Sequence, residues 1–188
     1  PLPAKKTAPR SWADRVRPQT QNLMKKISLP EVVLNMGVGQ SGDPIEIGKK
    51  ALEQITGKKP NARNAKKSQR DWGVRKGEPI GVAVTVRGND ATKLLKRLLA
   101  AKDNQIMERS IDNEGNLSFG LKEYIDIPEI KYDPKIGILG LEVSVSLARP
   151  GFNIKLRSRR KTKVGKNHRI RKNDAIKFLT EEFGVQIV

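Results

Sequence analysis

The feature that most constrains the fold of this chain is a basic stretch near its C-terminus that contains no acid. Between Glu142 and Asp174 the sequence has eleven Lys or Arg and not one Asp or Glu. Like charges at this density repel one another unless salt screens them or a polyanion neutralises them. The stretch therefore favours contact with nucleic acid over a solvated tail. The residues expected to make that contact are Arg157, Arg159, Arg160, Lys161, Lys163, His168 and Arg169.

Composition narrows the class of protein. With 38 Lys and Arg against 20 Asp and Glu, the formal net charge is +18, while 36% hydrophobic residues suffice to bury a core. The sequence has no apolar run of the roughly 18–20 residues that a spanning helix needs. Its N-terminus has no apolar signal core, so we expect a cytoplasmic protein. Cysteine is absent, which excludes disulfides, thiolate metal sites and cysteine nucleophiles.

Charge is also unevenly distributed along the chain. Residues 1–30 carry seven bases against one acid, and residues 58–76 carry eight bases against Asp71 alone. Residues 103–142 reverse the balance, with nine acids and four bases. A protein polarised in this way presents one face to a polyanion and turns another face away from it.

Periodicity predicts an α+β fold, a mostly antiparallel sheet with helices packed on one face. Residues 103–136 show no clear period, and residues 61–78 read as a polar, basic loop. Asp43 and Asn89 are the expected N-caps of two helices. The expected elements are strands at 32–38, 80–87, 139–147 and 185–188, and helices that begin at Asp43, at Asn89 and at Asn173 or Asp174.

Strand alternation separates the two faces of the predicted sheet. One face is apolar and should meet the helices. Its members are Val32, Leu34, Met36, Val82, Val84, Val86, Leu141, Val143, Val145 and Leu147. The other face is made of small or neutral hydrogen-bonding side chains and one arginine: Asn35, Gly37, Gly81, Ala83, Thr85, Arg87, Ser144 and Ser146.

The composition of this second face suggests a particular kind of partner. Small residues let a partner approach the backbone, and Asn, Thr and Arg bind sugars and phosphates. The face has no aromatic residue on which single-stranded bases would stack. We therefore expect a folded RNA, recognised by shape and backbone. The alternative is that a further layer of protein covers this face.

Two motifs suggest other functions and are weak. Gly37, Gly39 and Gly42 match the spacing of a dinucleotide-binding loop, but Asp43 would put a carboxylate where the pyrophosphate binds. No acid follows between Glu53 and Asp71 to hold a ribose. His168 is the only histidine and has no Cys or His partner for a metal site or triad. We therefore expect no catalysis, no cofactor and no metal.

Several stretches of the sequence resemble the universal large-subunit ribosomal protein L5 family, which binds 5S ribosomal RNA. The matching segments run in the family's order over most of residues 30–152, and the basic extension after them resembles the archaeal and eukaryotic branch. The family usually has Gln where this chain has Lys58. The segments are VVLNMGVGQSGD (32–43), ITGKKP (55–60), GVRKGEPIGVAVTVRG (73–88), GNLSFGLKEYIDIPEI (115–130) and KYDPKIGILGLEVSVSLARPGF (131–152).

The resemblance implies a structural constituent of the large ribosomal subunit, located in the central protuberance beside neighbouring ribosomal proteins. It implies that the sheet face binds 5S rRNA through Asn35, Lys58, Thr85 and Arg87. It also implies that a loop at residues 62–77 reaches peptidyl-site tRNA, with Arg63, Lys66, Lys67 and Arg70 as the candidate contacts. The basic run would bind large-subunit rRNA or the 5S backbone.

The corresponding division of the chain is an extended basic arm (1–29), an RNA-binding core (30–152) and a basic extension with a terminal helix (153–188). Two rival functions remain open. Charge alone does not separate RNA from DNA, so a chromatin-type protein is the first rival. A nucleotide-dependent oxidoreductase is the second, and it rests only on the glycine motif.

Overall fold

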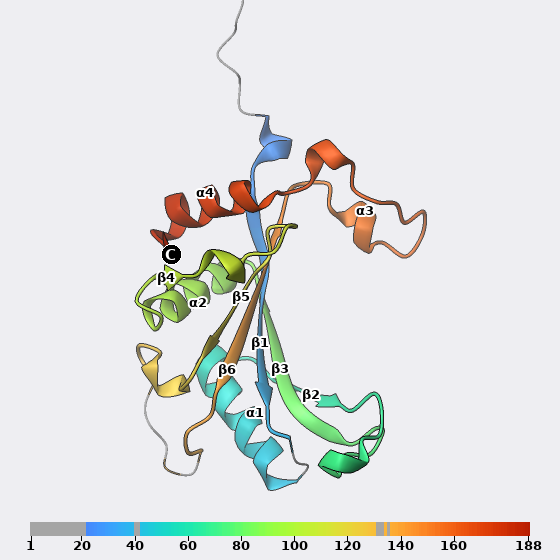
Figure 1. Cartoon of the computed structure of the whole chain (residues 1–188), viewed down its shortest axis with the longest axis vertical. Helices are drawn as coiled ribbons and strands as arrows, with labels where there is room; N and C mark the ends of the chain where they lie inside the picture. The colour runs from blue at the N-terminus through green and yellow to red at the C-terminus, as the bar shows by residue number, and fades with distance from the viewer. Residues whose placement is uncertain (1–21, 40–41, 131–133, 135) are drawn as a thin grey trace, which may run out of the picture.

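The computed structural model describes residues 22–39, 42–130, 134 and 136–188. Its centre is a five-stranded antiparallel sheet with the strand order β2-β3-β1-β6-β5 (Figure 1). The strands are β1 (Ser28–Gly37), β2 (Asn61–Asn64), β3 (Pro79–Arg87), β5 (Leu117–Leu121) and β6 (Leu141–Ala148). The α+β fold and the antiparallel sheet predicted from periodicity are confirmed.

Helices α1 (Asp43–Thr56) and α2 (Asn89–Ala100) pack against one face of this sheet (Figure 1). Their buried stripes, including Leu52 and Ile55 on α1 and Leu95 and Leu98 on α2, meet the apolar strand positions. Every strand residue predicted to face inward is buried, because alternation fixes one set of side chains on the helix-covered side. The predicted apolar face of the sheet is therefore confirmed as the face that the helices cover.

Both expected helix caps are wrong by one residue. The N-caps are Gly42 and Gly88, with φ of 100° and 72°, and neither helix has a side-chain cap. A glycine in a positive-φ conformation turns the chain directly from the preceding segment into the helix. Asp43 and Asn89 are thus the first helical residues, and Asp43 gives α1 a carboxylate in its positive first turn.

Residues 61–78 are not an irregular loop. β2 pairs with β3, and beyond it the chain forms a hydrogen-bonded hairpin: Ala65 pairs with Glu78 and Gly77, and Gln69 pairs with Val74. β2 is short and polar and lies at the sheet edge, so it has little of the alternation by which strands are recognised. This basic hairpin projects beyond the end of the sheet (Figure 1).

The segment without a clear period contains β5 and the two-residue β4 (Gln105–Ile106). β4 pairs in parallel with β7 (Gln186–Ile187), which confirms the predicted final strand. Such a two-residue strand carries too few positions to show a period. Its pairing depends on a segment at the far end of the chain.

The C-terminal extension contains a short helix α3 (Asn153–Leu156), a basic excursion and helix α4 (Lys172–Phe183). Helix α4 begins before the predicted Asn173, with Arg171 as N-cap. Ile170, Ala175, Leu179 and Val185 belong to the same buried cluster as the sheet residues. Along the described ranges, none of the helices is long and apolar enough to cross a membrane.

Candidate nucleic-acid interface

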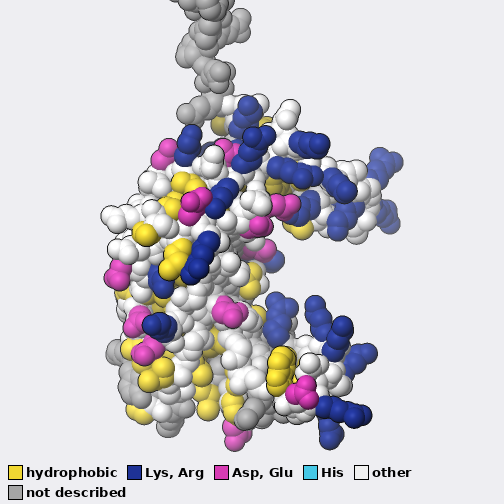
Figure 2. Space-filling model, in the orientation of Figure 1, with side chains coloured by type: hydrophobic (Ala, Val, Ile, Leu, Met, Phe, Trp, Pro, Cys, Tyr) yellow, Lys and Arg dark blue, Asp and Glu magenta, His cyan; other side chains and the backbone are white. Residues whose placement is uncertain are grey.

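Lys and Arg gather on two projections that flank a hollow in the molecular surface (Figure 2). Figure 1 identifies one projection as the β2–β3 hairpin and the other as the excursion around α3. We call them the basic hairpin (residues 61–78) and the basic arm (residues 153–171). Helices α1 and α2 lie on the side of the sheet away from the two projections, so the other face of the sheet is turned toward the hollow (Figure 1).

Strand register arranges the open face of the sheet in rows. One row is Asn61, Ala83, Asn35, Glu142 and Gly120, and the next toward the arm is Thr85, Val33, Ser144 and Ser118. A third row joins Arg87, Glu31 and Ser146. The described strands place no Phe, Tyr or Trp in these rows. Alternation thus brings Asn35, Thr85 and Arg87 together on one face, as predicted.

Two of these three residues already have carboxylate partners. Arg87 donates from Nε and Nη2 to Oε2 of Glu31, at 3.1 and 2.9 Å, and Asn35 donates from Nδ2 to Oε2 of Glu142 at 2.8 Å. Neither acid was predicted on this face. Alternation along the strands does place them there, because Glu31 and Glu142 are separated by an even number of residues from Asn35 and Ser144, respectively.

The glycines of the open sheet face differ in whether a side chain would fit at their positions. A Cβ at Gly81 would lie 2.9 Å from the backbone oxygen of Met36, so this glycine is needed for β1 and β3 to pair closely. A Cβ at Gly37 would meet nothing within 4 Å. The expectation that small residues make room for a partner therefore does not hold at Gly81, where the protein's own backbone fills the space.

Lys58 was grouped with the sheet face, and that placement is wrong. It follows the αL C-cap Gly57 in the connection between α1 and β2. Its Nζ lies 3.0 Å from Oδ2 of Asp90, in the first turn of α2. The hydrogen bond and charge of Lys58 hold the pKa of Asp90 below its usual value. Its ammonium is therefore paired at the helix N-terminus rather than presented from a strand.

The basic hairpin contributes both to the open face and to a separate tip. Arg63 pairs with Gly81 in the strand register, so it shares the face of Asn61 and extends the open face of the sheet. Lys66, Lys67 and Arg70 are exposed further out. Trp72 is also exposed there, in a 3₁₀ turn (Arg70–Trp72) that ends at the left-handed Gly73.

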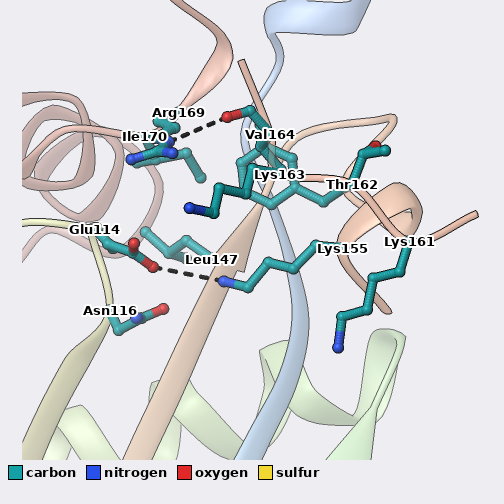
Figure 3. Close-up of a pocket in the computed structure, with 11 residues that line it drawn as sticks. Glu114, Asn116, Leu147, Lys155, Lys161, Thr162, Lys163, Val164, Arg169 and Ile170 are labelled. Atoms are coloured by element: carbon teal, nitrogen blue, oxygen red, sulfur yellow. Dashed lines mark hydrogen bonds and ion pairs between the residues drawn. The ribbon is translucent and has the colours of Figure 1, made fainter. Parts of the chain in front are cut away.

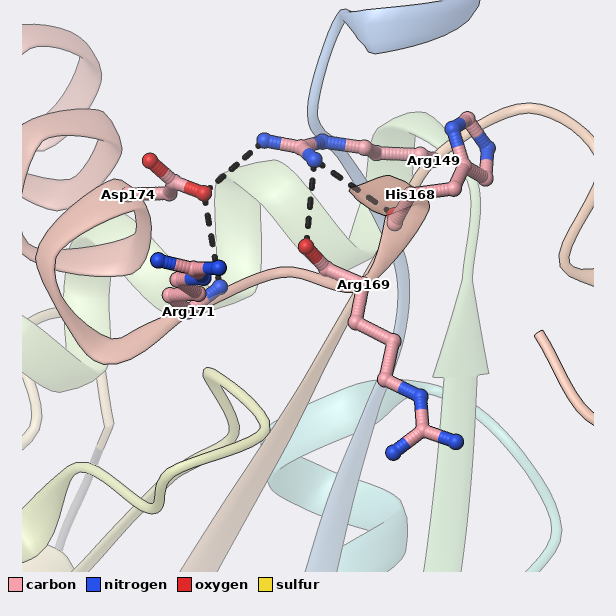
Figure 4. A network of polar contacts seen from close by, with 5 residues as sticks. All are labelled: Arg149, His168, Arg169, Arg171 and Asp174. Atoms are coloured by element: carbon pink, nitrogen blue, oxygen red, sulfur yellow. Dashed lines mark hydrogen bonds and ion pairs between the residues drawn. The ribbon is translucent and has the colours of Figure 1, made fainter. Parts of the chain in front are cut away.

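The basic arm is docked on the body at both ends. Val164 and Ile170 are buried along it. At its base the nearly buried Arg149 guanidinium donates to the carbonyls of His168 (3.4 Å) and Arg169 (3.2 Å) and to Asp174 (3.0 Å) (Figure 4). The arm is thus a charged loop that is tethered to the body of the protein.

Three arm residues that were predicted to contact RNA also make polar contacts within the protein. His168 Nε2 lies 2.8 Å from the Pro150 carbonyl oxygen, and its ring packs edge-on against Phe152. Arg157 Nε donates to the Arg160 carbonyl, and Arg169 Nε donates to the Val164 carbonyl. The remaining candidates, Arg159, Arg160, Lys161 and Lys163, are exposed.

The structure also bears on the rival functions. The first three strands of the sheet pair antiparallel, unlike the parallel strands of a dinucleotide fold. Residues 40 and 41 of the glycine motif lie outside the described residues. Among the residues that the structure describes, no group of three His, Asp or Glu side chains is arranged to hold a metal ion.

Comparison with known proteins identifies the family. Residues 22–75 match the family model described as ribosomal protein L5, and residues 79–185 match the model of the C-terminus of the same ribosomal family. Large ribosomal subunit protein uL5 of Nitrosopumilus maritimus is 64% identical over 89% of this chain and 97% of its own length. The proteins of that name from Cenarchaeum symbiosum and Pyrobaculum aerophilum are 59% and 48% identical, over 88% and 87% of this chain and 98% and 92% of their own lengths. The chain therefore belongs to the ribosomal protein L5 family.

Proposed function

We propose that this chain is a structural constituent of the large ribosomal subunit that binds 5S rRNA across the open sheet face. Its relatives are named as large-subunit proteins, and the family is one of structural ribosomal proteins, so the chain is not an enzyme. Its place of action is the ribosome in the cytoplasm. The observation that carries the proposal is the hydrogen-bonding sheet face lying between two basic projections (Figure 2).

The two kinds of surface suit different parts of a folded RNA. The projections carry exposed cations, such as Lys66 and Lys161, which attract phosphates. The rows between them carry hydroxyl and amide groups on Thr85, Ser118, Ser144 and Asn35. An RNA minor groove is wide and shallow and displays 2′-hydroxyls, which such groups bind. This division of groups favours RNA over DNA, since DNA has no 2′-hydroxyl.

Direct binding tests the proposal and its chromatin-type alternative. The full chain should retain 5S rRNA on a filter at a salt concentration at which duplex DNA of equal length is released. Equal retention of DNA and RNA over the whole salt range would favour the alternative, because backbone charge alone would then explain binding.

We further propose that the subunit position is the central protuberance, with the hairpin directed toward peptidyl-site tRNA and the arm against large-subunit rRNA or the 5S backbone. Neighbouring ribosomal proteins would complete the site. Two observations support this role for the hairpin. It projects beyond the sheet (Figure 1), and Lys66, Lys67 and Arg70 on it are exposed.

Serine at those three hairpin positions should reduce tRNA retention by reconstituted subunits and leave 5S affinity nearly unchanged. The matched control replaces Lys50, Lys93 and Lys96 with serine, which removes the same charge from exposed positions on α1 and α2. If both triple variants reduce tRNA retention equally, net charge and not the hairpin explains the effect.

A further inference from the structure

A pocket lies beneath the basic arm, apart from the sheet rows. Its volume is about 500 Å³, within the roughly 300–1,000 Å³ of small-ligand sites. The arm, strand β6 and the turn before β5 supply its walls (Figure 3). Leu147, Val164 and Ile170 form its apolar wall and are buried, and Phe152 lines it as well.

The polar groups around the pocket are arranged at its edge. The Asn116 side chain is half-buried and lines the pocket, and Figure 3 shows no hydrogen bond from it to the other residues drawn. Lys155 reaches across to Glu114, with Nζ and Oε2 3.5 Å apart, and Lys161 and Lys163 line the pocket from the arm (Figure 3). An apolar wall, an amide at its edge and the two arm lysines Lys161 and Lys163 suit a nucleotide, which has a flat base, a hydrogen-bonding edge and a phosphate.

Gly115 explains how the polar edge comes so close to the apolar wall. It has a φ of +79°, and a Cβ there would lie 2.6 Å from Cγ2 of Ile170. Only a glycine lets the turn approach Ile170 this closely. The approach places its neighbours Glu114 and Asn116 on the pocket.

From these observations we propose that the pocket binds one unstacked nucleotide of the RNA that the protein holds, a proposal that rests on the proposed function. The base lies against Leu147, Phe152 and Val164, and its edge meets the Asn116 amide. Its phosphate is attracted by the exposed lysines of the arm, Lys161 and Lys163, which line the pocket. RNA-binding proteins read sequence at such unstacked bases, and the described sheet face has no aromatic residue with which to do so.

The first test uses the free protein and does not depend on 5S rRNA. Nucleoside monophosphates added to the full chain should shift, in a saturable way, the NMR signals of the Asn116 side-chain amide and of the methyl groups of Leu147 and Val164. Inorganic phosphate should shift the lysine signals only. If nucleotides produce no more than phosphate does, the pocket does not hold a base and the proposal is wrong.

The second test uses the complex with 5S rRNA. Asn116→Leu replaces the amide with an apolar group of similar size and should weaken binding roughly 5- to 100-fold, the scale of losing a stacked base. The slope of log affinity against log salt should change little, because Lys161 and Lys163 stay in place and still attract phosphates. Asn113→Leu, an exposed position in the same turn, is the control and should bind as the parent does.

The outcomes separate this proposal from the function on which it rests. If the parent binds 5S rRNA and Asn116→Leu matches it at equal thermal stability, the pocket proposal fails alone. If the parent does not bind 5S rRNA, the proposed function fails, and the nucleotide titration still decides about the pocket. If Asn116→Leu does not fold, Asn116→Ala replaces it and should weaken binding to a smaller extent at an unchanged salt slope.

Discussion

Arg87 and Glu31 lie directly opposite each other on β3 and β1, and the guanidinium donates twice to one carboxylate oxygen, at 3.1 and 2.9 Å. The Arg87 side chain is 73% exposed, so the pair contributes only about 0–1 kcal/mol to stability. Glu31 therefore competes with any phosphate that approaches Arg87. RNA binding at this corner of the sheet must exchange one anionic partner for another.

Replacing Glu31 with Gln should strengthen 5S rRNA binding, because it removes that competitor and a negative charge from the interface. We expect a gain of about 0.5–1 kcal/mol at low salt, the scale of an exposed ion pair. Filter binding measures it. The control is Glu53→Gln on the exposed side of α1, which changes the net charge equally. Equal gains in both variants would show that Glu31 has no local role.

Substitutions on opposite faces of β3 should have different effects. Thr85→Val and Arg87→Ala should each weaken the 5S complex by roughly 1–3 kcal/mol, the scale of a lost buried or charge-assisted hydrogen bond. Val84 is buried on the helix side, so Val84→Ala should instead lower the free energy of unfolding by about 2 kcal/mol. Filter binding and denaturant unfolding measure the two effects. Equal affinity losses at equal stability in all three would contradict the face assignment.

The Lys58–Asp90 pair predicts a pH dependence. Lys58 holds the pKa of Asp90 below the usual 3.8, mainly by its hydrogen bond and then by its charge. The pair's contribution to stability is present above that usual value and disappears as the pH falls through the lowered pKa. In Lys58→Gln, the Asp90 pKa should rise toward its usual value in an NMR titration. An unchanged pKa would mean that the ion pair does not form in solution.

Arg149 should be essential for docking the basic arm. Its guanidinium joins two carbonyls of the arm to Asp174, and the side chain is only 11% exposed (Figure 4). Arg149→Ala should cost about 1.5–3 kcal/mol in denaturant unfolding, since it leaves charged and polar partners unsatisfied. It should also speed proteolysis at residues 157–163. Arg149→Lys should rescue only part of the loss, because an ammonium lacks the planar fork that spans these acceptors.

Much of the architecture was predictable because it depends on local periodicity. Alternation identified β1, β3 and β6, and their register then brought Asn35, Thr85 and Arg87 onto one face. Side-chain parity is a property of the strand itself, so no knowledge of the partner strands was needed. The resemblance to the family added the expectation that the RNA is 5S rRNA, which alternation does not contain.

The missed features depend on contacts that no local pattern records. β2 is recognisable only through its pairing with β3, and β4 only through the distant β7. His168 lies in a run of cations, but its ring is held by Pro150 and Phe152. The pocket at Asn116 was missed for the same reason, because the turn and the arm that form it lie far apart in the sequence.

The basic arm should bind phosphates through charges that are separate from the residues that dock it on the body. Serine at Arg157, Arg159, Arg160, Lys161 and Lys163 removes five charges and leaves the anchors Val164, Ile170 and Arg149 in place. Each phosphate that is no longer neutralised should reduce the magnitude of the slope of log affinity against log salt by about 0.7–0.9. The five-serine variant should therefore have a slope that is flatter by several units. Binding to 5S rRNA over a salt series measures it. Serine at Lys50, Lys93, Lys96 and Lys102, exposed on α1 and α2 and just after α2, is the control and should flatten the slope far less per charge removed. A five-serine variant whose slope matches the parent's would show that the arm does not touch RNA, and its charges would then be a solvated surface.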